Sequence, residues 1–283
     1  MAKGDCIVWV TSDMHTNSFT GLSPYYFEHE GGTHKANELQ RWLWRNWRDM
    51  WEKRATAVKL EEKLPLIYVH NGDAHDGPGV KQSPAVITRN ESDMLRLAVQ
   101  VIEPALNVAD RVYIMRGTEA HTGKQAWREE SLAEDIGAEK SPDGTYSWWR
   151  LFANWGGVLF DVRHHPETSG TKNWTRDAAH GRIAFEVLSD YVLNGMTPPD
   201  VALRAHTHVF GEGVSHKGQY TTRAYTTPPW QKTTSYGHRI AAGLNQDTGG
   251  IFFVIRNGKI TRSDFVKYEP KKLQPHRVDW NDS

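Results

Sequence analysis

The stretch Tyr-Val-His-Asn-Gly-Asp-Ala-His-Asp-Gly, residues 68–77, decides how the rest of this sequence is interpreted. The apolar run at 66–69 predicts a buried strand, and it leads directly into Gly72, Asp73 and Asp76. A glycine lets the backbone turn sharply, so Asp73 is expected at the carboxyl end of the strand, where ligands bind in open α/β sheets. Taken alone, the stretch favours an ordinary polar turn, in which Asp and Gly serve turn formation and solubility.

Four more short apolar runs, at 6–10, 112–115, 158–162 and 201–204, are each followed by Asp, His or Glu. These four runs and the run at 66–69 are expected to be strands. The clusters that follow them are Asp13-Met14-His15, Arg116-Gly117-Thr118-Glu119-Ala120-His121, His164-His165-Pro166 and His206-Thr207-His208. If the five strands run parallel, their carboxyl ends lie on one side of the sheet and the clusters converge.

Such a convergence predicts a metal centre. Burying many His and carboxylate groups together is costly without a counter-charge, whereas divalent cations make the arrangement favourable. Mixed imidazole and carboxylate donors suit Zn, Mn, Fe or related transition metals rather than a structural cysteine zinc site.

The composition sets wider bounds. Lys plus Arg and Asp plus Glu number 34 each among 283 residues, so no overall field attracts nucleic acid or an anionic membrane. The single Cys6 excludes an intramolecular disulfide framework and fits a reducing cytoplasm. The sequence shows neither a signal-peptide core at residues 1–10 nor a membrane-length apolar stretch, so a cytoplasmic protein without membrane contact is expected.

A long helix is expected at 34–63, with Trp residues along one stripe and Arg residues interleaved. Alternating aromatic and Arg side chains could stack bases and bind phosphates, but a stripe at helical spacing is more often core, and packing is the favoured interpretation. Further helices are expected at 90–107, 127–136 and 175–193, and irregular segments at 16–33 and 137–155. The β-rich region at 220–266 includes an Asn257-Gly258 hairpin turn. We expect one domain over 1–267, with 34–63 as an insertion, and a polar tail at 268–283.

In their order along the chain, the clusters resemble the calcineurin-like metallophosphoesterases, which include phosphatases, nucleotide phosphodiesterases and Mre11-type nucleases. The likeness extends from Asp13 to His208, and the ordered set is specific although each piece alone is weak. The Trp-rich segments and the altered third cluster are similar to phosphoesterases carried by bacteriophages and prophages. The resemblance implies an α/β fold of two packed mixed β-sheets flanked by helices, a β-sandwich with α layers.

The resemblance also implies the metal ligands. Those of a first metal would be Asp13, His15 and His208, with Asp73 bridging to a second. The second would be completed by His206 and by either His164 or His165. His164 is favoured because the family commonly places proline two residues after this ligand, but His165 remains open.

The third cluster departs from the family pattern, which is usually Gly-Asn-His followed by an acidic residue. Here Thr118 stands where the family has the Asn ligand of the second metal. Glu119 is chemically a better replacement ligand than a hydroxyl, and His121 is the best replacement for the catalytic His. Arg116 is a candidate substrate-binding residue.

The activity implied is hydrolysis of a phosphomonoester or phosphodiester, with two divalent cations (Mn, Zn, Fe or Ni) activating water. His121 would protonate the leaving oxygen, and Asp76 would orient His121 or a ligand. A nucleotide or nucleic-acid substrate is weakly favoured. The alternative is a catalytically weak module that binds metal and phosphate in a regulatory or interaction role.

Overall fold

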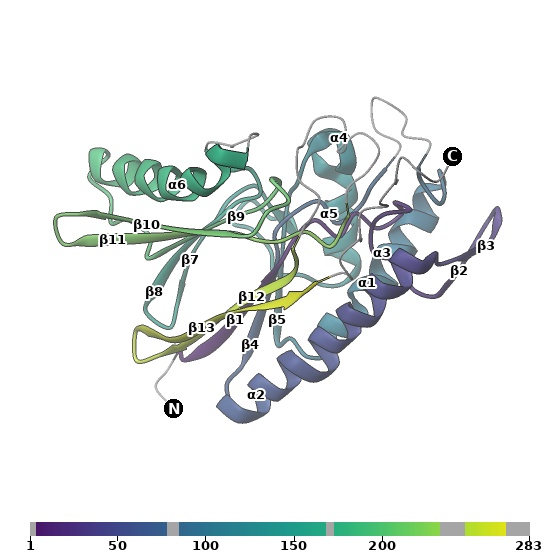
Figure 1. Cartoon of the computed structure of the whole chain (residues 1–283), viewed down its shortest axis with the longest axis horizontal. Coiled ribbons are helices and arrows are strands. Elements are labelled where there is room, and N and C mark those ends of the chain that lie inside the picture. The colour runs from purple at the N-terminus through teal and green to yellow at the C-terminus, as the bar shows by residue number, and fades with distance from the viewer. Residues whose placement is uncertain (1–3, 78–84, 168–172, 233–246, 270–283) are drawn as a thin grey trace, which may run out of the picture.

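A computed structural model describes residues 4–77, 85–167, 173–232 and 247–269 of the chain. Two large β-sheets pack against each other, with helices on their outer faces (Figure 1). The expected fold class, two packed mixed sheets flanked by helices, is confirmed.

The first sheet has the strand order β13-β12-β1-β4-β5-β6. Its strands are β1 (Cys6–Thr11), β4 (Leu66–His70), β5 (Arg111–Met115), β6 (Ser147–Trp148), β12 (Thr248–Arg256) and β13 (Lys259–Tyr268). The strands β1, β4, β5 and β6 run parallel, whereas β12 pairs antiparallel with β1 and with β13. Every residue of β1 and β4 is buried, as expected for apolar strands covered on both faces.

The second sheet has the order β10-β11-β9-β8-β7. Its strands are β7 (Leu151–Trp155), β8 (Val158–Val162), β9 (Val201–Arg204), β10 (Gly211–Lys217) and β11 (Tyr220–Thr226). The inner faces of the two sheets share one apolar core, in which the ring of Phe253 on β12 lies 5.6 Å from Phe160 on β8 and 5.3 Å from Tyr225 on β11.

One long helix covers the outer face of the first sheet (Figure 1). It runs from α1 (Glu38–Asp49) through the π-helical turn η1 (Met50–Ala55) into α2 (Thr56–Glu62), and α3 (Glu91–Leu106) lies beside it. Asn37 and Gln40 form a capping box at the start of α1. Trp47 and Trp51 are fully buried, and Trp47 Nε1 donates to Val101 O on α3 at 2.7 Å. The packing interpretation of this helix is therefore confirmed, because its Trp side chains form core.

The remaining helices are α4 (Glu119–Thr122), the short η2 (Lys124–Ala126), α5 (Trp127–Asp135) and α6 (Asn173–Leu193). Helix α6 lies across the outer face of the second sheet (Figure 1), where Ile183, Val187 and Tyr191 pack on Ala202 and Ala224.

Four expectations about secondary structure need correction. The five ligand-bearing strands are divided between two sheets, with β1, β4 and β5 in one and β8 and β9 in the other. The segment 16–33 is not wholly irregular, because β2 (Tyr26–His29) begins within it and forms a hairpin with β3 (Gly32–Lys35). The segment 137–155 contains β6 and β7. The expected tail at 268–283 begins too early, because Tyr268 belongs to β13, and residues 270–283 lie outside the described residues.

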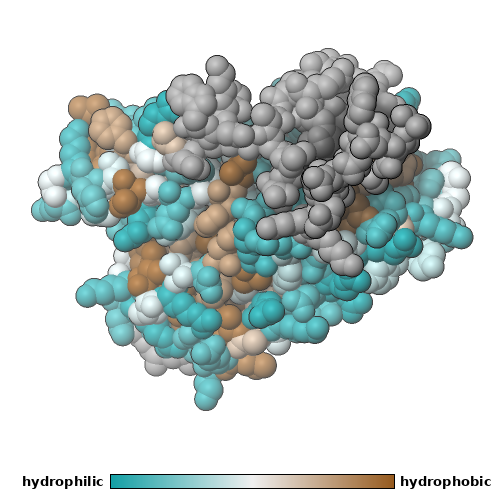
Figure 2. Space-filling view, viewed as in Figure 1, coloured by the Kyte–Doolittle hydropathy of each residue, from teal (hydrophilic) through white to brown (hydrophobic). Residues whose placement is uncertain are grey.

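Within the described part of the chain, the search for a helix with the length and apolarity of a membrane span finds none. On the face drawn in Figure 2, hydrophobic residues are interspersed with hydrophilic ones. Scattered exposed apolar side chains of this kind are normal for a folded protein surface.

Candidate metal centre

The predicted clusters meet because the two sheets bring their strand ends together. The turns after β1 and β4 are joined by hydrogen bonds from Asp13 N to Gly72 O (2.9 Å) and from His15 N to Asp73 O (3.0 Å). After β8 and β9, Ala205 N donates to His164 O at 2.9 Å. The expected convergence is present, and both sheets contribute to it.

The backbone at these turns adopts an uncommon conformation. Positive φ angles occur at five predicted ligands: Asp13 (51°), His15 (43°), Asp73 (55°), His206 (67°) and His208 (56°). Non-glycine residues seldom adopt such angles, and backbone strain of this kind tends to gather where side chains must be aimed at a ligand.

The first ligand group consists of Asp13, His15 and His208. His208 Nε2 lies 3.2 Å from both Asp13 Oδ1 and His15 Nε2. Asp13 is fully buried, and neither of its carboxylate oxygens has a hydrogen-bond partner among the described residues. Burial would raise the pKa of Asp13, but His208 and His15 hold that pKa well below its usual range. The group therefore presents buried donor atoms with unused lone pairs.

Asp73 stands between this group and a second one. Its Oδ2 lies 3.9 Å from His15 Nε2 and 3.1 Å from His164 Nε2, and its Oδ1 accepts from Thr118 N at 2.6 Å. Burial opposes ionisation of Asp73, but neighbouring His164 brings the pKa of the carboxyl below its usual range. Gly117 permits this approach, because a Cβ there would lie 2.2 Å from Asp73 Oδ1.

The second group consists of His164, His165 and His206, arranged around the Thr118 hydroxyl. His164 Nδ1 donates to Asn71 O at 2.7 Å, so the neutral imidazole would carry its lone pair on Nε2, the atom that a metal would bind. Burial would lower the pKa of His164, but Asp73, whose Oδ2 is 3.1 Å from Nε2, raises that pKa to about 10 in the metal-free chain. Burial, followed by the neighbouring His164, lowers the pKa of His206 to about 4.

His121 and Asp76 form a hydrogen-bonded pair next to the first group. His121 Nδ1 lies 3.0 Å from Asp76 Oδ1, and the His121 ring meets the His15 ring edge-on at 4.7 Å. Burial alone would lower the pKa of His121, but Asp76 and Asp73 raise it to about 9. Gln231, which the sequence did not single out, donates from Nε2 to Asp76 Oδ2 at 3.3 Å.

Two candidate residues lie outside these groups. Glu119 accepts from Gln125 N at 3.1 Å and belongs to none of the potential ligand groups found among the described residues. Arg116 is held by Ser147 Oγ (2.8 Å) and Glu130 Oε2 (3.3 Å), so its guanidinium already has acceptors.

Glu129 on α5 is a residue that sequence reasoning missed. Its carboxylate is fully buried and accepts Ala74 N at 3.1 Å and Gly117 N at 2.5 Å, which ties the turn of Asp73 to the turn of Thr118. Burial, and then the charge of Asp73, raises the pKa of Glu129 to about 8. The available signal was its spacing from the apolar Leu132, which places a carboxylate on the buried face of α5.

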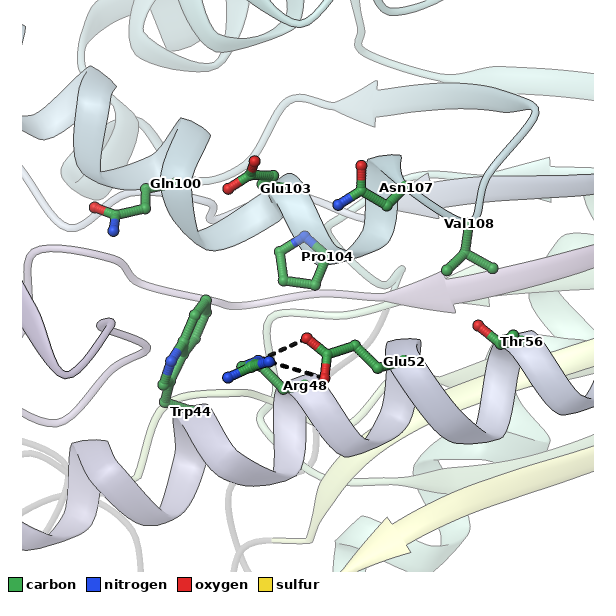
Figure 3. A pocket seen from close by; sticks show the side chains of 9 residues that line it. All are labelled: Trp44, Arg48, Glu52, Thr56, Gln100, Glu103, Pro104, Asn107 and Val108. Carbon is green, nitrogen blue, oxygen red and sulfur yellow. Dashed lines mark hydrogen bonds and ion pairs between the residues drawn. The ribbon is translucent and has the colours of Figure 1, made fainter.

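A separate hollow of about 520 Å³ lies between the long helix and α3 (Figure 3). Trp44 and the Arg48–Glu52 ion pair, in which Nε and Oε1 are 2.6 Å apart, line one side, and Glu103 and Asn107 line the other. None of its lining residues belongs to the ligand groups.

No protein-family model and no curated protein matches the sequence. Among solved structures, the chain resembles the sulfate thiohydrolase SoxB of Thermus thermophilus at 12% identity and a TM-score of 0.44, covering 95% of this chain and 57% of that one. It also resembles 5'-nucleotidase of Candida albicans at 10% identity and a TM-score of 0.43, covering 95% of this chain and 52% of that one.

A third structure, a predicted phosphoesterase of Streptococcus pneumoniae, shares 10% identity at a TM-score of 0.34, covering 94% of this chain and 100% of that one. The chain spans just over half the length of SoxB and of the nucleotidase. At these identities and TM-scores, the likeness does not by itself assign an activity.

Proposed function

We propose that the chain is a calcineurin-like metallophosphoesterase, which hydrolyses a phosphomonoester or phosphodiester with the help of two divalent cations. The observation that carries the proposal is the position of the Asp73 carboxylate, whose Oδ2 faces His15 on one side and His164 on the other. A carboxylate shared by two ligand groups is the arrangement that fixes two cations close together in hydrolases of this kind.

The residues present fit divalent transition metals. The buried oxygens of Asp13 accept no hydrogen bond from the described residues, so a bound cation would offset the cost of burying them. The proposed ligands are Asp13, His15 and His208 for one cation, His164 and His206 for the other, and Asp73 for both. Imidazole and carboxylate donors suit Mn, Zn, Fe or Ni. Bound there, the cations would activate a water molecule and neutralise charge on the phosphate oxygens.

His121 is the proposed proton donor to the leaving oxygen. It is partly exposed, with 34% of its side chain accessible, so a substrate can reach its ring. Asp76 holds the Nδ1 side of the ring at 3.0 Å and leaves Nε2 to face the substrate. Gln231 in turn holds the other oxygen of Asp76.

A nucleotide or nucleic-acid substrate remains the favoured class, but the aromatic side chains that favour it are not those of the long helix. Trp44, Trp47 and Trp51 of the long helix are packed in the core, which removes them as a base-stacking surface. Two exposed Trp side chains lie near the third cluster, Trp127 six residues after His121 and Trp149 against Arg116, and they are 42% and 54% exposed. Each packs on an Arg guanidinium, Trp149 on Arg116 and Trp127 on Arg128. Aromatic rings backed by Arg can stack bases.

The test is hydrolysis of an aryl phosphodiester and an aryl phosphomonoester by protein loaded with Mn²⁺ and, separately, with Zn²⁺. Asp73→Asn is expected to lower turnover by at least about 100-fold, because an amide cannot bridge two cations as a carboxylate does. Asp143→Asn, an exposed Asp in a turn, serves as the control and should leave turnover unchanged. Equal turnover by the Asp73 variant and the wild type would disprove the two-metal mechanism.

The second candidate is a catalytically weak module that binds metal and phosphate. It is favoured by Thr118, whose hydroxyl stands where the resembling family has an amide ligand. Metal and phosphate binding without turnover on either ester would identify this function. Turnover that Asp73→Asn abolishes would exclude it.

A further inference from the structure

The second ligand group lacks one donor if it is built only from the residues expected from the sequence. Asp73, His164 and His206 supply three donor atoms, and the fourth, an amide in the resembling family, is replaced by the Thr118 hydroxyl. That hydroxyl donates its one proton to Asp73 Oδ2 at 3.2 Å. A neutral hydroxyl is a weaker ligand than imidazole for a transition metal, so another donor would strengthen the site.

His165 is placed to be that donor. Its Nε2 lies 3.3 Å from Thr118 Oγ1, and around the same oxygen lie His164 Nε2 at 3.4 Å, His206 Nδ1 at 3.1 Å and Asp73 Oδ2 at 3.2 Å. The three imidazole donor atoms all lie within 4.8 Å of one another. Nitrogen ligands bind Zn²⁺ at about 2.0–2.1 Å, so the ligand atoms of a tetrahedral site are roughly 3.4 Å apart, and small rotations of the rings would reach this spacing.

The turn that carries His165 is held by ion pairs to Glu167 from a fully buried Arg and from a partly exposed one. Arg204 is fully buried at the end of β9. Its Nε donates to Glu167 Oε2 at 3.1 Å, and its Nη2 donates to Glu167 Oε1 at 2.7 Å. Arg163 pairs with the same carboxylate. Because Glu167 lies two residues after His165 and Arg204 lies two residues before His206, these bonds fix the two His-bearing turns relative to each other.

The His165 ring packs against the other two His rings. It meets the His164 ring at 4.9 Å and 87°, and the His206 ring at 4.7 Å and 46°. Among the described residues, the hydrogen-bond partner of its Nε2 is the Thr118 hydroxyl. His165 is thus an exposed imidazole whose donor atom faces the other ligands.

We infer that His165 takes the ligand place left by the missing amide, so that the second cation is held by three imidazoles and the shared Asp73 carboxylate. This inference rests on the proposed two-metal function and deepens it. The choice between His164 and His165 as the ligand then disappears, because both would bind the second cation. Exchanging an amide oxygen for a third imidazole shifts the preference of this site towards Zn, Ni or Fe and away from Mn and Mg.

The experiment compares three variants of the full chain after removal of metal and reloading with Zn²⁺. Bound zinc is counted by mass spectrometry, and affinity is measured against a competing chromophoric chelator. The variants are His165→Ala, Thr118→Val and the control His216→Ala, whose residue is exposed on β10. Near-ultraviolet circular dichroism verifies that each variant is folded.

Wild type and His216→Ala are expected to bind two zinc ions. His165→Ala should retain the first and bind the second at least about 100-fold more weakly, since even residues that only orient a metal ligand change affinity by about 10–100-fold. Added imidazole should restore the second zinc, because His165 is exposed and its removal leaves an open space next to the donors. Thr118→Val should weaken the second zinc less than His165→Ala does.

Two results would overturn the inference while leaving the proposed function intact. One is full, unweakened binding of both zinc ions by His165→Ala with only a raised KM for the ester, which would make His165 a substrate contact. The other is loss of the second zinc in Thr118→Val but not in His165→Ala. Failure of the proposed function is distinguishable, because the wild type would then bind no zinc or Asp73→Asn would hydrolyse the ester normally.

Discussion

Arg204→Met tests whether the buried ion pairs behind the second ligand group hold the protein together. Arg204 is fully buried and donates to the carboxylates of Glu167 and Asp161 and to the carbonyls of Asp161 and Leu203. Burial would raise the pKa of Asp161, but Arg204 and Arg150 hold it below its usual range. Met fills similar space without any donor, so the acceptors lose these partners.

The expected cost follows from these contacts. Removing one partner of a buried pair typically destabilises a protein by about 3–5 kcal/mol, because the remaining charge stays buried. For a chain of this size, each kcal/mol lowers the melting temperature by about 2–4 °C, which gives a decrease of roughly 6–20 °C. Urea unfolding followed by circular dichroism measures the free energy, and thermal unfolding measures the temperature.

The control is Arg223→Met in the neighbouring strand β11. Arg223 pairs with Glu212 at 3.3 Å, but the two side chains are 51% and 47% exposed. An exposed pair contributes only about 0–1 kcal/mol, so this variant should unfold close to the wild type. If the two Met variants lose the same free energy within about 0.5 kcal/mol, the burial argument is wrong. Adding Glu167→Gln to Arg204→Met should cost less than the sum of the single changes, because both act on one network.

Three further predictions concern the metal centre. Glu129→Gln should lower the free energy of unfolding in urea by about 2 kcal/mol, because the amide nitrogen would face one of the two backbone N–H donors. The control is Glu134→Gln at an exposed position, and an equally small effect of both changes would contradict this prediction. In metal-free protein, Asp76→Asn should lower the pKa of His121 from about 9 towards its ordinary value near 6.5, as seen in an NMR titration, and an unchanged pKa would rule out the pair as the cause. The stability from that pair is fully present below about pH 6.5 and is lost as the pH rises through about 9. Free metal at 100 times its dissociation constant should stabilise the chain by about 2.7 kcal/mol in thermal unfolding, reversed by a chelator, whereas identical curves with and without metal would argue against a built site.

The ligand-bearing strands could be located from the sequence because strands buried on both faces are continuous apolar runs. The run at 66–69 was read in this way, and it is part of β4. The sequence did not reveal which strand belongs to which sheet, because strand pairing depends on partners far apart in the chain, such as β1 and β12. Strand β7 was missed because its residues 151–155 mix buried and exposed positions and follow a Trp-rich segment that has no regular period.

Some residues of the site could likewise be predicted from local sequence, and others could not. Asp13, Asp73 and His208 follow apolar runs directly, so local sequence places them at strand ends. Glu129 lies in the first turn of α5. Its spacing from Leu132 places it on the buried face, but nothing near it in the sequence indicates that its carboxylate accepts hydrogen bonds from Ala74 N and Gly117 N. Thr118 was a visible departure, but its surroundings are contributed by His residues 46 to 88 positions away, which only the fold brings together.

The contact between His15 and His208 spans 193 positions of the chain, and it joins a turn of one sheet to a turn of the other. Chain segments so far apart meet late in folding, because the entropy of closing long loops is lost before such contacts form. The cations therefore have no complete site to bind until both sheets have docked. Bound metal should leave the refolding rate nearly unchanged and lower the unfolding rate, so that the centre stabilises the folded chain kinetically.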